Sequence, residues 1–396
     1  MLEFPFAMSR LLAPISVDEF FAEYYGHKPL VISRGHPDYY AEIISLDTLD
    51  GFLAALRPTR EHLQVVDARR ELGDEDYLIA GTQFVDLVKM HRLFAEGATI
   101  SFRNMHNYVD GLTQVCRNAE WHFSCPVKAN IYFSPPDAQG FRVHHDTHDV
   151  LVLQIFGSKK WRTFAPVIEA PLPGQGVYWE EGTPGLPLRE FTLHAGDFLY
   201  CPKGIPHDAQ STTDASLHVT LGALSKSWAE LLLECIADVA LRDPALRANL
   251  PPRYATAGVD PAELMTTFRK LLKRVELQAQ PKKVLSDFAD ELIFESRQIL
   301  SDQRLQIGLL SKLNLASTMG ARPGTISRFV TERGKFKVLF YHSEIEFPAS
   351  VQPAILFALK NTRFRVDEVP GEFSAQEKLM LMRRLVLEGL VICLEA

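Results

Sequence analysis

The chain has 396 residues, of which 46% are hydrophobic and 23% are charged, and its formal net charge is -7. This length predicts two or three domains rather than one core, and the composition is that of ordinary globular proteins. The acidic charge disfavours nucleic acid as the main ligand, because phosphate binding needs a basic face. It favours a basic protein or peptide substrate, which the summed field would attract.

The five cysteines are scattered and include no Cys-x-x-Cys pair. Their odd number argues against a disulfide framework or a zinc ribbon and favours a cytoplasmic location. Residues 1–14 lack the long apolar core and the small-residue cleavage site of a secretory signal, so no such signal is expected. No apolar stretch approaches the roughly 20 residues that a membrane span requires, so no membrane partner is expected.

Helices and short strands are expected before residue 120. Ser16 and Glu19 have the spacing of a capping box, which predicts a helix over 16–25 ahead of an extended segment at 29–32. The later elements are a helix over 46–56, strands within 63–84 interrupted by the charged run 67–76, a helix over 86–96, a strand over 98–102 and a helix over 107–118. The charged run is expected to be a solvated loop rather than a site.

Short β runs separated by Pro and Gly recur from residue 127 to residue 224. This pattern predicts a closed or double-sheet β architecture. Residues 171–188 are rich in Gly and Pro and are numerous enough to cover the mouth of a barrel. Two interpretations of this segment stay open, a lid over a site and an inert surface excursion.

A candidate metal site begins at His144 and Asp146, which are two residues apart at the start of an apolar β run. Side chains two apart on a strand point to the same side, so these two can converge. His207, just after a short strand and a Pro- and Gly-containing turn, offers a third ligand, and Asp197 is expected to shape the turn before that strand. A lone His-x-Asp pair is common by chance, but two imidazoles and one carboxylate in this spacing are typical of non-haem Fe(II) oxygenases.

Lys159 is a candidate for binding an anion. It shares a strand face with Trp161, and the Trp face is expected to point inward. A buried ammonium without a partner is costly, so it needs an anion such as the far carboxylate of a dicarboxylate that chelates iron through a 2-oxo acid. Asn130, Tyr132 and Ser134 also share one face, and Ser134 could donate a hydrogen bond to the same carboxylate. The alternative is a solvated lysine at a strand end.

The strand over 216–222 alternates between aliphatic and polar residues. Its three aliphatic residues take one face, and His218 and Thr220 take the other. His218 therefore either faces the co-substrate or is a structural histidine with satisfied hydrogen bonds.

Three stretches together resemble the Jumonji-C (cupin-type) 2-oxoglutarate oxygenases of the ribosomal oxygenase group. They are FFAEYYGHKPLVI, NIYFSPPDAQGFRVHHDTHDVLVLQIFGSKKWRTF and GDFLYCPKGIPHDAQST, and the similarity runs from about residue 20 to residue 224. The resemblance implies a double-stranded β-helix, that is, a jelly-roll or cupin barrel. It also implies hydroxylation of arginine or histidine side chains in ribosomal proteins, whereas more distant relatives demethylate lysines.

Position by position, the resemblance implies Fe(II) held by His144, Asp146 and His207. It implies that Lys159 and Ser134 hold the distal carboxylate of 2-oxoglutarate, and Asn130 and His218 are further candidates for contact with this co-substrate. One departure is His145, where relatives usually carry an aromatic residue; it leaves the ligands intact and bears on the local substrate contact.

Beyond residue 226 the composition changes to helix formers. The segment 228–248 has leucines on more than one face and is interrupted by Pro244, so its apolar surface needs a partner, for which a homodimer contact is one solution. Further helices are expected over 261–278 and 282–300, where the relatives have a helical dimerisation region.

The last ninety or so residues form another unit. The expected elements are strands over 336–340 and 345–347, a helix over 350–360, a helix from Ser374 to about 389 and a strand over 390–394. This order is compatible with a winged helix, which relatives also have. DNA binding is disfavoured, because Arg383 and Arg384 are the only adjacent basic pair on the final helix.

These observations predict an α+β chain in three parts: a Jumonji-C/cupin catalytic domain with N-terminal helices (1–225), a helical dimerisation region (226–305) and a winged-helix-like domain (306–396). The expected function is Fe(II)- and 2-oxoglutarate-dependent hydroxylation of a protein, with ribosomal proteins favoured, or of a peptide. Alternatives are demethylation of lysine or arginine, tailoring of a ribosomally made peptide natural product, and a non-catalytic metal-binding cupin. The inward lysine argues against the last.

Overall fold

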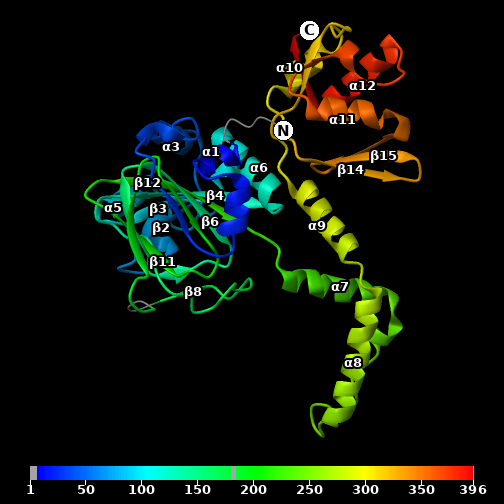
Figure 1. The fold of residues 1–396 in the computed structure, drawn as a ribbon. Coiled ribbons are helices and arrows are strands. Elements are labelled where there is room, and N and C mark those ends of the chain that lie inside the picture. The colour runs from blue at the N-terminus through cyan, green and yellow to red at the C-terminus, as the bar shows by residue number, and fades with distance from the viewer. Residues whose placement is uncertain (1–6, 180–183, 396) are drawn as a thin grey trace.

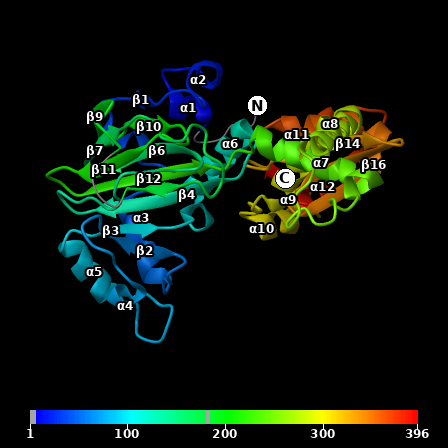
Figure 2. The ribbon, with the colours of Figure 1, turned by 90° about the horizontal axis from the view of Figure 1, so that it is seen from below.

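The computed structural model describes residues 7–179 and 184–395. A β domain with surrounding helices occupies the N-terminal half, an arm of helices follows, and a smaller unit of helices and short strands ends the chain (Figures 1 and 2). Within the described part, no helix has the length and apolarity needed to cross a membrane. Residues 1–6, which belong to the stretch judged above for a secretory signal, lie outside the described residues.

The N-terminal helices and strands mostly fall where the sequence predicts them. They are α1 (Met8–Leu12), α2 (Val17–Glu23), β1 (Leu30–Ile32), η1 (Pro37–Tyr40), α3 (Leu46–Ala55), β2 (Leu63–Val66), α4 (Asp74–Tyr77), α5 (Leu87–Ala95), β3 (Thr99–Phe102), η2 (Met105–Asn107) and α6 (Asp110–Phe123). The expected cap is present, since the Ser16 hydroxyl accepts a hydrogen bond from the Glu19 amide at 3.1 Å.

The charged run 67–76 is mostly exposed to solvent, as expected, but it differs from a plain loop at its two ends. Strand β2 stops at Val66, and the far end of the run folds into α4. The Asp67 carboxylate is buried, and it accepts hydrogen bonds from the Arg69 guanidinium at 2.8 and 2.9 Å. A buried carboxylate needs such partners, so Asp67 fixes the start of the run, while the following residues stay accessible to solvent.

Two antiparallel sheets form the β domain. The remaining strands are β4 (Val127–Ser134), β5 (His144–His145), β6 (Asp149–Phe156), β7 (Ser158–Thr163), β8 (Val177–Tyr178), β9 (Arg189–His194), β10 (Phe198–Cys201), β11 (His207–Ser211) and β12 (Ser216–Ala223). The larger sheet has the order β1-β10-β6-β12-β4-β3-β2, and the smaller has the order β8-β5-β11-β7-β9. The predicted double-sheet β architecture is therefore present.

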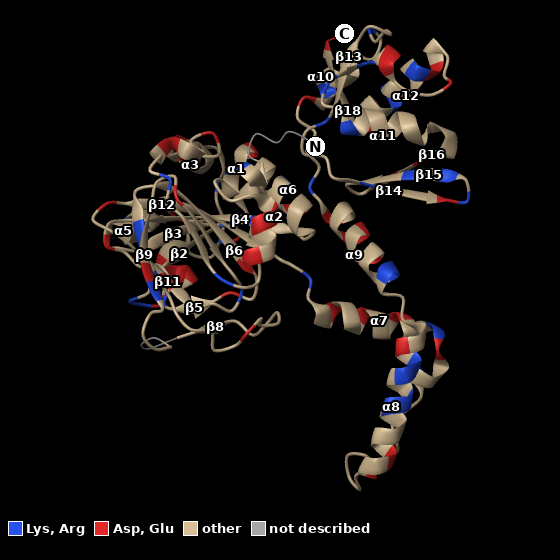
Figure 3. Cartoon of the chain, viewed as in Figure 1, with Lys and Arg blue, Asp and Glu red and all other residues tan. Residues whose placement is uncertain are grey.

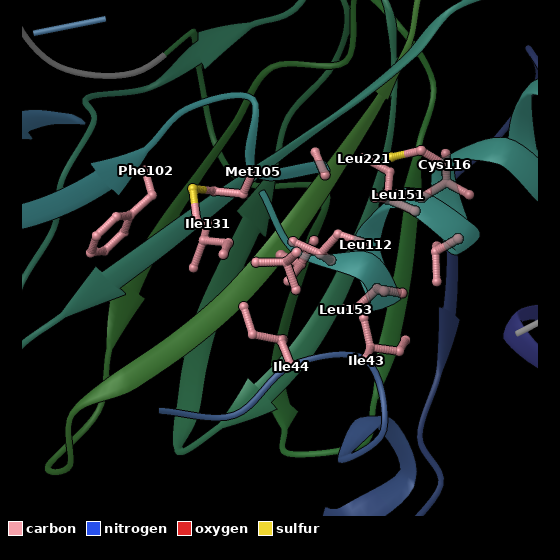
Figure 4. Close-up of a cluster of buried hydrophobic side chains, with 14 of the residues drawn as sticks. Ile43, Ile44, Phe102, Met105, Leu112, Cys116, Ile131, Leu151, Leu153 and Leu221 are labelled. Atoms are coloured by element: carbon pink, nitrogen blue, oxygen red, sulfur yellow. The ribbon is translucent and has the colours of Figure 1, made fainter. Parts of the chain in front are cut away.

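The main core lies on the outer face of the larger sheet, where α6 covers it (Figure 4). Ile131 of β4 and Leu221 of β12 point to this core with Leu112 of α6, and all three are fully buried. Because neighbouring side chains on a strand alternate, the residues between them face the other sheet. This alternation turns the polar positions of β4 and β12 toward the space between the two sheets.

The turn between β6 and β7 depends on Gly157, whose φ is +63° and where an added Cβ would lie 1.9 Å from the Ala215 carbonyl oxygen. We expect Gly157→Ala to destabilise the chain by about 2–4 kcal/mol, since it adds a steric clash to backbone strain. Urea unfolding measures the change. Gly174→Ala is the matched control, because Gly174 also has a positive φ, +88°, but no atom lies near the added Cβ. This variant should reduce the free energy of unfolding by only about 1 kcal/mol. Equal losses would contradict the role of the clash.

The arm consists of α7 (Trp228–Arg242), η3 (Pro244–Arg247), α8 (Pro261–Gln278) and α9 (Pro281–Glu295), followed by α10 (Gln303–Leu309). The predicted interruption at Pro244 is confirmed, and α9 ends five residues earlier than expected. There the chain becomes extended, and the Arg297 carbonyl accepts a hydrogen bond from Arg117 of α6. Helix α8 buries none of its side chains and carries both basic and acidic residues along its length (Figure 3).

The C-terminal unit contains β13 (Thr318–Ala321), β14 (Ser327–Glu332), β15 (Lys335–Phe340), β16 (Ser343–Pro348), η4 (Ala349–Val351), α11 (Gln352–Lys360), β17 (Phe364–Arg365), η5 (Val366–Glu368), α12 (Ala375–Leu387) and β18 (Val391–Glu395). Its strands form two three-stranded sheets, β17-β13-β18 and β14-β15-β16. The predicted strands and helices of this unit are confirmed, whereas α10, β13, β14, β17 and η5 were not predicted. A buried cluster that includes Phe336, Val338 and Met382 forms the core of this unit.

Candidate active site

The three predicted metal ligands meet at one point between the sheets. His144 of β5 lies directly opposite His207 of β11 in the antiparallel register, and Asp146 follows two residues after His144. Their ligand atoms all lie within 4.8 Å of one another, and 3.7 Å separates His207 Nε2 from Asp146 Oδ2. All three line a cavity of about 610 Å³, a size typical of small-molecule sites.

Both imidazoles are oriented by backbone carbonyls. The Nδ1 of His144 lies 2.9 Å from the Arg142 carbonyl oxygen, and the Nδ1 of His207 lies 3.0 Å from that of Ile205. A carbonyl oxygen can only accept a hydrogen bond, so each Nδ1 carries the proton and each Nε2 keeps a free lone pair. Such second contacts fix the orientation of metal-binding histidines.

The protonation states also suit a divalent cation. Burial lowers the pKa of His144 to about 4, so its imidazole is neutral near pH 7. Burial alone would raise the pKa of Asp146, but the surrounding imidazoles bring it below its usual value. Two neutral imidazoles and one carboxylate are the donors that non-haem Fe(II) sites use, and the residues therefore fit this metal.

Lys159 of β7 is buried, so the alternative of a solvated lysine at a strand end is wrong. Its Nζ donates a hydrogen bond to the Ser134 hydroxyl at 2.9 Å and lies 3.5 Å from His218 Nδ1. Burial lowers the pKa of Lys159 to about 7. No carboxylate of the described residues lies within 4 Å of this nitrogen, so the geometry leaves Lys159 available for an external anion.

Ser134 occupies a different place from the one expected. It is fully buried and is not among the residues that line the cavity, and its hydroxyl is 2.8 Å from that of Thr99. Thr99 of β3 does line the cavity. The register of β3 and β4 continues from Ile100 opposite Phe133 to Thr99 beside Ser134, and the sequence alone carries no sign of this pairing. Ser134 therefore positions Lys159, and Thr99 presents a hydroxyl to the cavity.

His218 and Asn130 both line the cavity, as their strand faces predict. The His218 ring stacks on Tyr132 with centroids 5.0 Å apart, and burial with the nearby Lys159 charge lowers its pKa well below the usual value. Asn130 accepts a hydrogen bond from the Asn104 amide at 3.0 Å, so its carbonyl oxygen is occupied. The Trp161 and His218 rings pack edge-to-face, with centroids 5.7 Å apart. Tyr132 and Trp161 are thus wall residues that the sequence identified only by their strand faces.

The segment 171–188 forms part of the cavity wall through β8, which pairs with β5. The Tyr178 ring stacks on His144 with an interplanar angle of 10° and centroids 5.1 Å apart. His145 points away from the cavity, where its Nε2 donates a hydrogen bond to the Gln175 carbonyl at 2.8 Å. His145, the one departure from the pattern of the relatives, thus contacts this segment and does not line the cavity. Residues 180–183 of the segment lie outside the described residues.

Residues 104–231 match the family described as the JmjC domain. The chain is 29% identical over 283 residues to ribosomal oxygenase 2 of Rattus norvegicus, covering 69% of this chain and 60% of that protein. It is 32% identical over 250 residues to a bifunctional lysine-specific demethylase and histidyl-hydroxylase of Drosophila erecta, covering 61% of this chain and 38% of that protein. The chain thus spans less than two thirds of the length of these relatives. The resemblance found in the sequence motifs is confirmed.

Solved structures of the ribosomal oxygenase YcfD from Escherichia coli have a similar fold. One aligns over 96% of this chain and 98% of that chain, with a TM-score of 0.59 and 19% identity. Another, in complex with cobalt and 2-oxoglutarate, aligns over 96% and 99% with a TM-score of 0.56 and 19% identity. The JmjC/cupin-type fold, with mixed helices and antiparallel sheets, is thereby confirmed.

Proposed function

Because residues 104–231 match the family described as the JmjC domain, we propose that this protein is an Fe(II)- and 2-oxoglutarate-dependent oxygenase that hydroxylates a protein side chain. The observation that carries the proposal is the meeting of His144, Asp146 and His207 in one cavity that also contains the buried ammonium of Lys159. The names of the relatives, ribosomal oxygenase and histidyl-hydroxylase, support a ribosomal protein as the target.

Each wall residue has a role in this proposal. His144, Asp146 and His207 would hold Fe(II), because their ligand atoms converge. With Fe(II) bound, 2-oxoglutarate and O2 supply the oxidation that adds one oxygen atom to a C–H bond and yields succinate and CO2. Lys159 takes up a proton and pairs with the distal carboxylate of 2-oxoglutarate, while Ser134 fixes the ammonium. Tyr178 shields His144 from solvent.

Demethylation of lysine is the second candidate, because the Drosophila relative carries that activity in its name. Intact-mass analysis of ribosomal proteins from a deletion strain and its parent separates the two. Hydroxylation predicts that one parental protein is heavier by one oxygen atom than its counterpart in the deletion strain. Demethylation predicts that the parental protein is lighter by one or more methylene units. Identical masses across all ribosomal proteins would contradict a ribosomal target.

The chain is proposed to consist of a catalytic domain (1–225), a helical dimerisation region (226–305) and a winged-helix-like domain (306–396).

The net charge of -7 supports a basic protein or peptide substrate, and it gives no support to nucleic acid as a partner. The five free cysteines support a cytoplasmic location. The apolar residues exposed on the arm support a homodimer, since Trp228 is 80% exposed and Leu233 is 65% exposed.

The homodimer gives a direct prediction about α8. Phe268 and Leu272 lie one helical turn apart on this helix and are about half exposed. We expect the double substitution Phe268→Glu and Leu272→Glu to convert a dimer into a monomer, because it places two charges in an apolar interface. Light scattering after size exclusion measures the mass. Leu186→Glu, at an exposed position outside the arm, is the control and should remain dimeric. A monomeric wild type would contradict the proposal.

A further inference from the structure

Two cations stand at the mouth of the cavity, Arg103 just after β3 and Lys128 near the start of β4. Both line the 610 Å³ cavity, and both side chains are exposed to solvent. Exposed cations elsewhere, such as Arg60 and Lys160, lie within 4 Å of a carboxylate, but none of the described carboxylates comes this close to Arg103 or Lys128. These two charges are available to a molecule that enters the cavity.

The strand register directs both cations toward the site. Lys128 lies opposite Gly222 of β12 and two residues from Asn130, so it shares the face of β4 that lines the cavity. Phe102 lies opposite Ile131, which brings the next residue, Arg103, beside Asn130. The hydrogen bond of 3.0 Å from the Asn104 amide to Asn130 fixes the chain at this point.

The charge balance of the cavity makes its mouth positive. Among the described lining residues Asp146 is the one carboxylate, and the proposed function assigns it to the metal. A divalent cation, Asp146, the dicarboxylate 2-oxoglutarate and a protonated Lys159 together carry no net charge. Arg103 and Lys128 therefore remain as an uncompensated positive pair where a substrate side chain must enter.

Resting on the proposed function, we propose that Arg103 and Lys128 determine which side chain is oxidised. They bind a carboxylate next to the target residue and repel guanidinium and ammonium groups. The target side chain is then uncharged and polar, such as an imidazole or an amide, within an acidic segment. A substrate that is basic overall satisfies this requirement when the segment that enters the cavity carries the carboxylate. A cationic methyl-lysine does not satisfy it.

Labelled synthetic peptides that share one backbone sequence test this selection. Their central residue is His, Arg or Lys, and its neighbour is Asp or Asn. We expect the peptide with His and Asp to bind the full-length chain most tightly in fluorescence anisotropy. Replacing Asp by Asn, or His by Arg, should weaken binding roughly fivefold, the effect of an exposed ion pair. The differences should shrink at high salt, because solvent-exposed charges are screened.

Charge reversal provides the matched comparison. The double variant Arg103→Glu and Lys128→Glu should reverse the order of the peptide affinities, so that the peptide with a central Arg binds most tightly. Arg92→Glu also replaces an exposed cation by an acid, on α5 and away from the cavity, and should leave the order unchanged. Equal binding of all peptides by the wild type, or an order that survives the double reversal, would overturn the proposal.

The measurement separates this inference from the proposed function. Peptide binding requires neither turnover nor a bound metal, whereas succinate formation in the absence of peptide reports on oxygenase chemistry. Succinate formation without a charge preference overturns the selection by Arg103 and Lys128 alone. A charge preference without succinate formation supports the selection and contradicts the oxygenase assignment.

Discussion

Replacing His144 or Asp146 with alanine is expected to abolish succinate formation and to weaken metal binding by more than about a hundredfold, because even loss of an outer partner of a ligand costs 10- to 100-fold. Each substitution removes one of the three protein ligands that converge within 4.8 Å. Titration with Mn(II) or Co(II) measures metal affinity independently of turnover. Loss of turnover and loss of affinity should therefore occur together.

His145→Ala is the matched control for this prediction. His145 lies between the two ligands in sequence, yet its ring points away from the cavity and contacts the segment around Gln175. The variant should keep its metal affinity, because the orientation of His144 depends on the Arg142 carbonyl rather than on His145. Wild-type turnover in His144→Ala would remove the metal assignment, whatever the control shows.

Strand alternation explains why the metal ligands and Lys159 could be predicted from the sequence. His144 and Asp146 share a face because they are two apart, and the same rule turned Lys159 and His218 toward the cavity. These statements need only local geometry. The helix starts were accessible for the same reason, since the cap at Ser16 depends on a residue three positions away.

What the sequence did not predict depends on contacts between distant segments. Ser134 and Thr99 are 35 residues apart, and only the pairing of β3 with β4 decides which hydroxyl faces the cavity. Tyr178 reaches His144 because β8 pairs with β5, which no local pattern signals. In the C-terminal unit, β13 is four residues long and includes Gly320, so it lacks the alternation that identifies a strand.

Lys159→Met is expected to raise the KM for 2-oxoglutarate by roughly two to four orders of magnitude, since removing one member of a buried ion pair costs roughly 3–5 kcal/mol. Its effect on kcat should be small, because Lys159 contacts the distal end of the co-substrate. Kinetics with varied 2-oxoglutarate measure both constants. Ser134→Ala is the comparison and should raise KM less, by roughly 10- to 100-fold, the cost of losing one hydrogen bond to a charged group. An unchanged KM in Lys159→Met would contradict the anion site.

The same lysine gives the binding of 2-oxoglutarate a pH dependence. Burial lowers the pKa of Lys159 to about 7, so above pH 7 the free protein holds it largely as the neutral amine. A bound carboxylate favours the ammonium and raises this pKa, so binding near pH 8 must take up a proton. The affinity for 2-oxoglutarate is therefore greatest below pH 7 and falls as the pH rises above 7. The fall ends once the pH exceeds the raised pKa of Lys159 in the complex. Calorimetric titration in two buffers of different ionisation enthalpy measures the proton uptake. Lys159→Met should show neither the uptake nor the fall in affinity, and a wild type without proton uptake at pH 8 would contradict this role for Lys159.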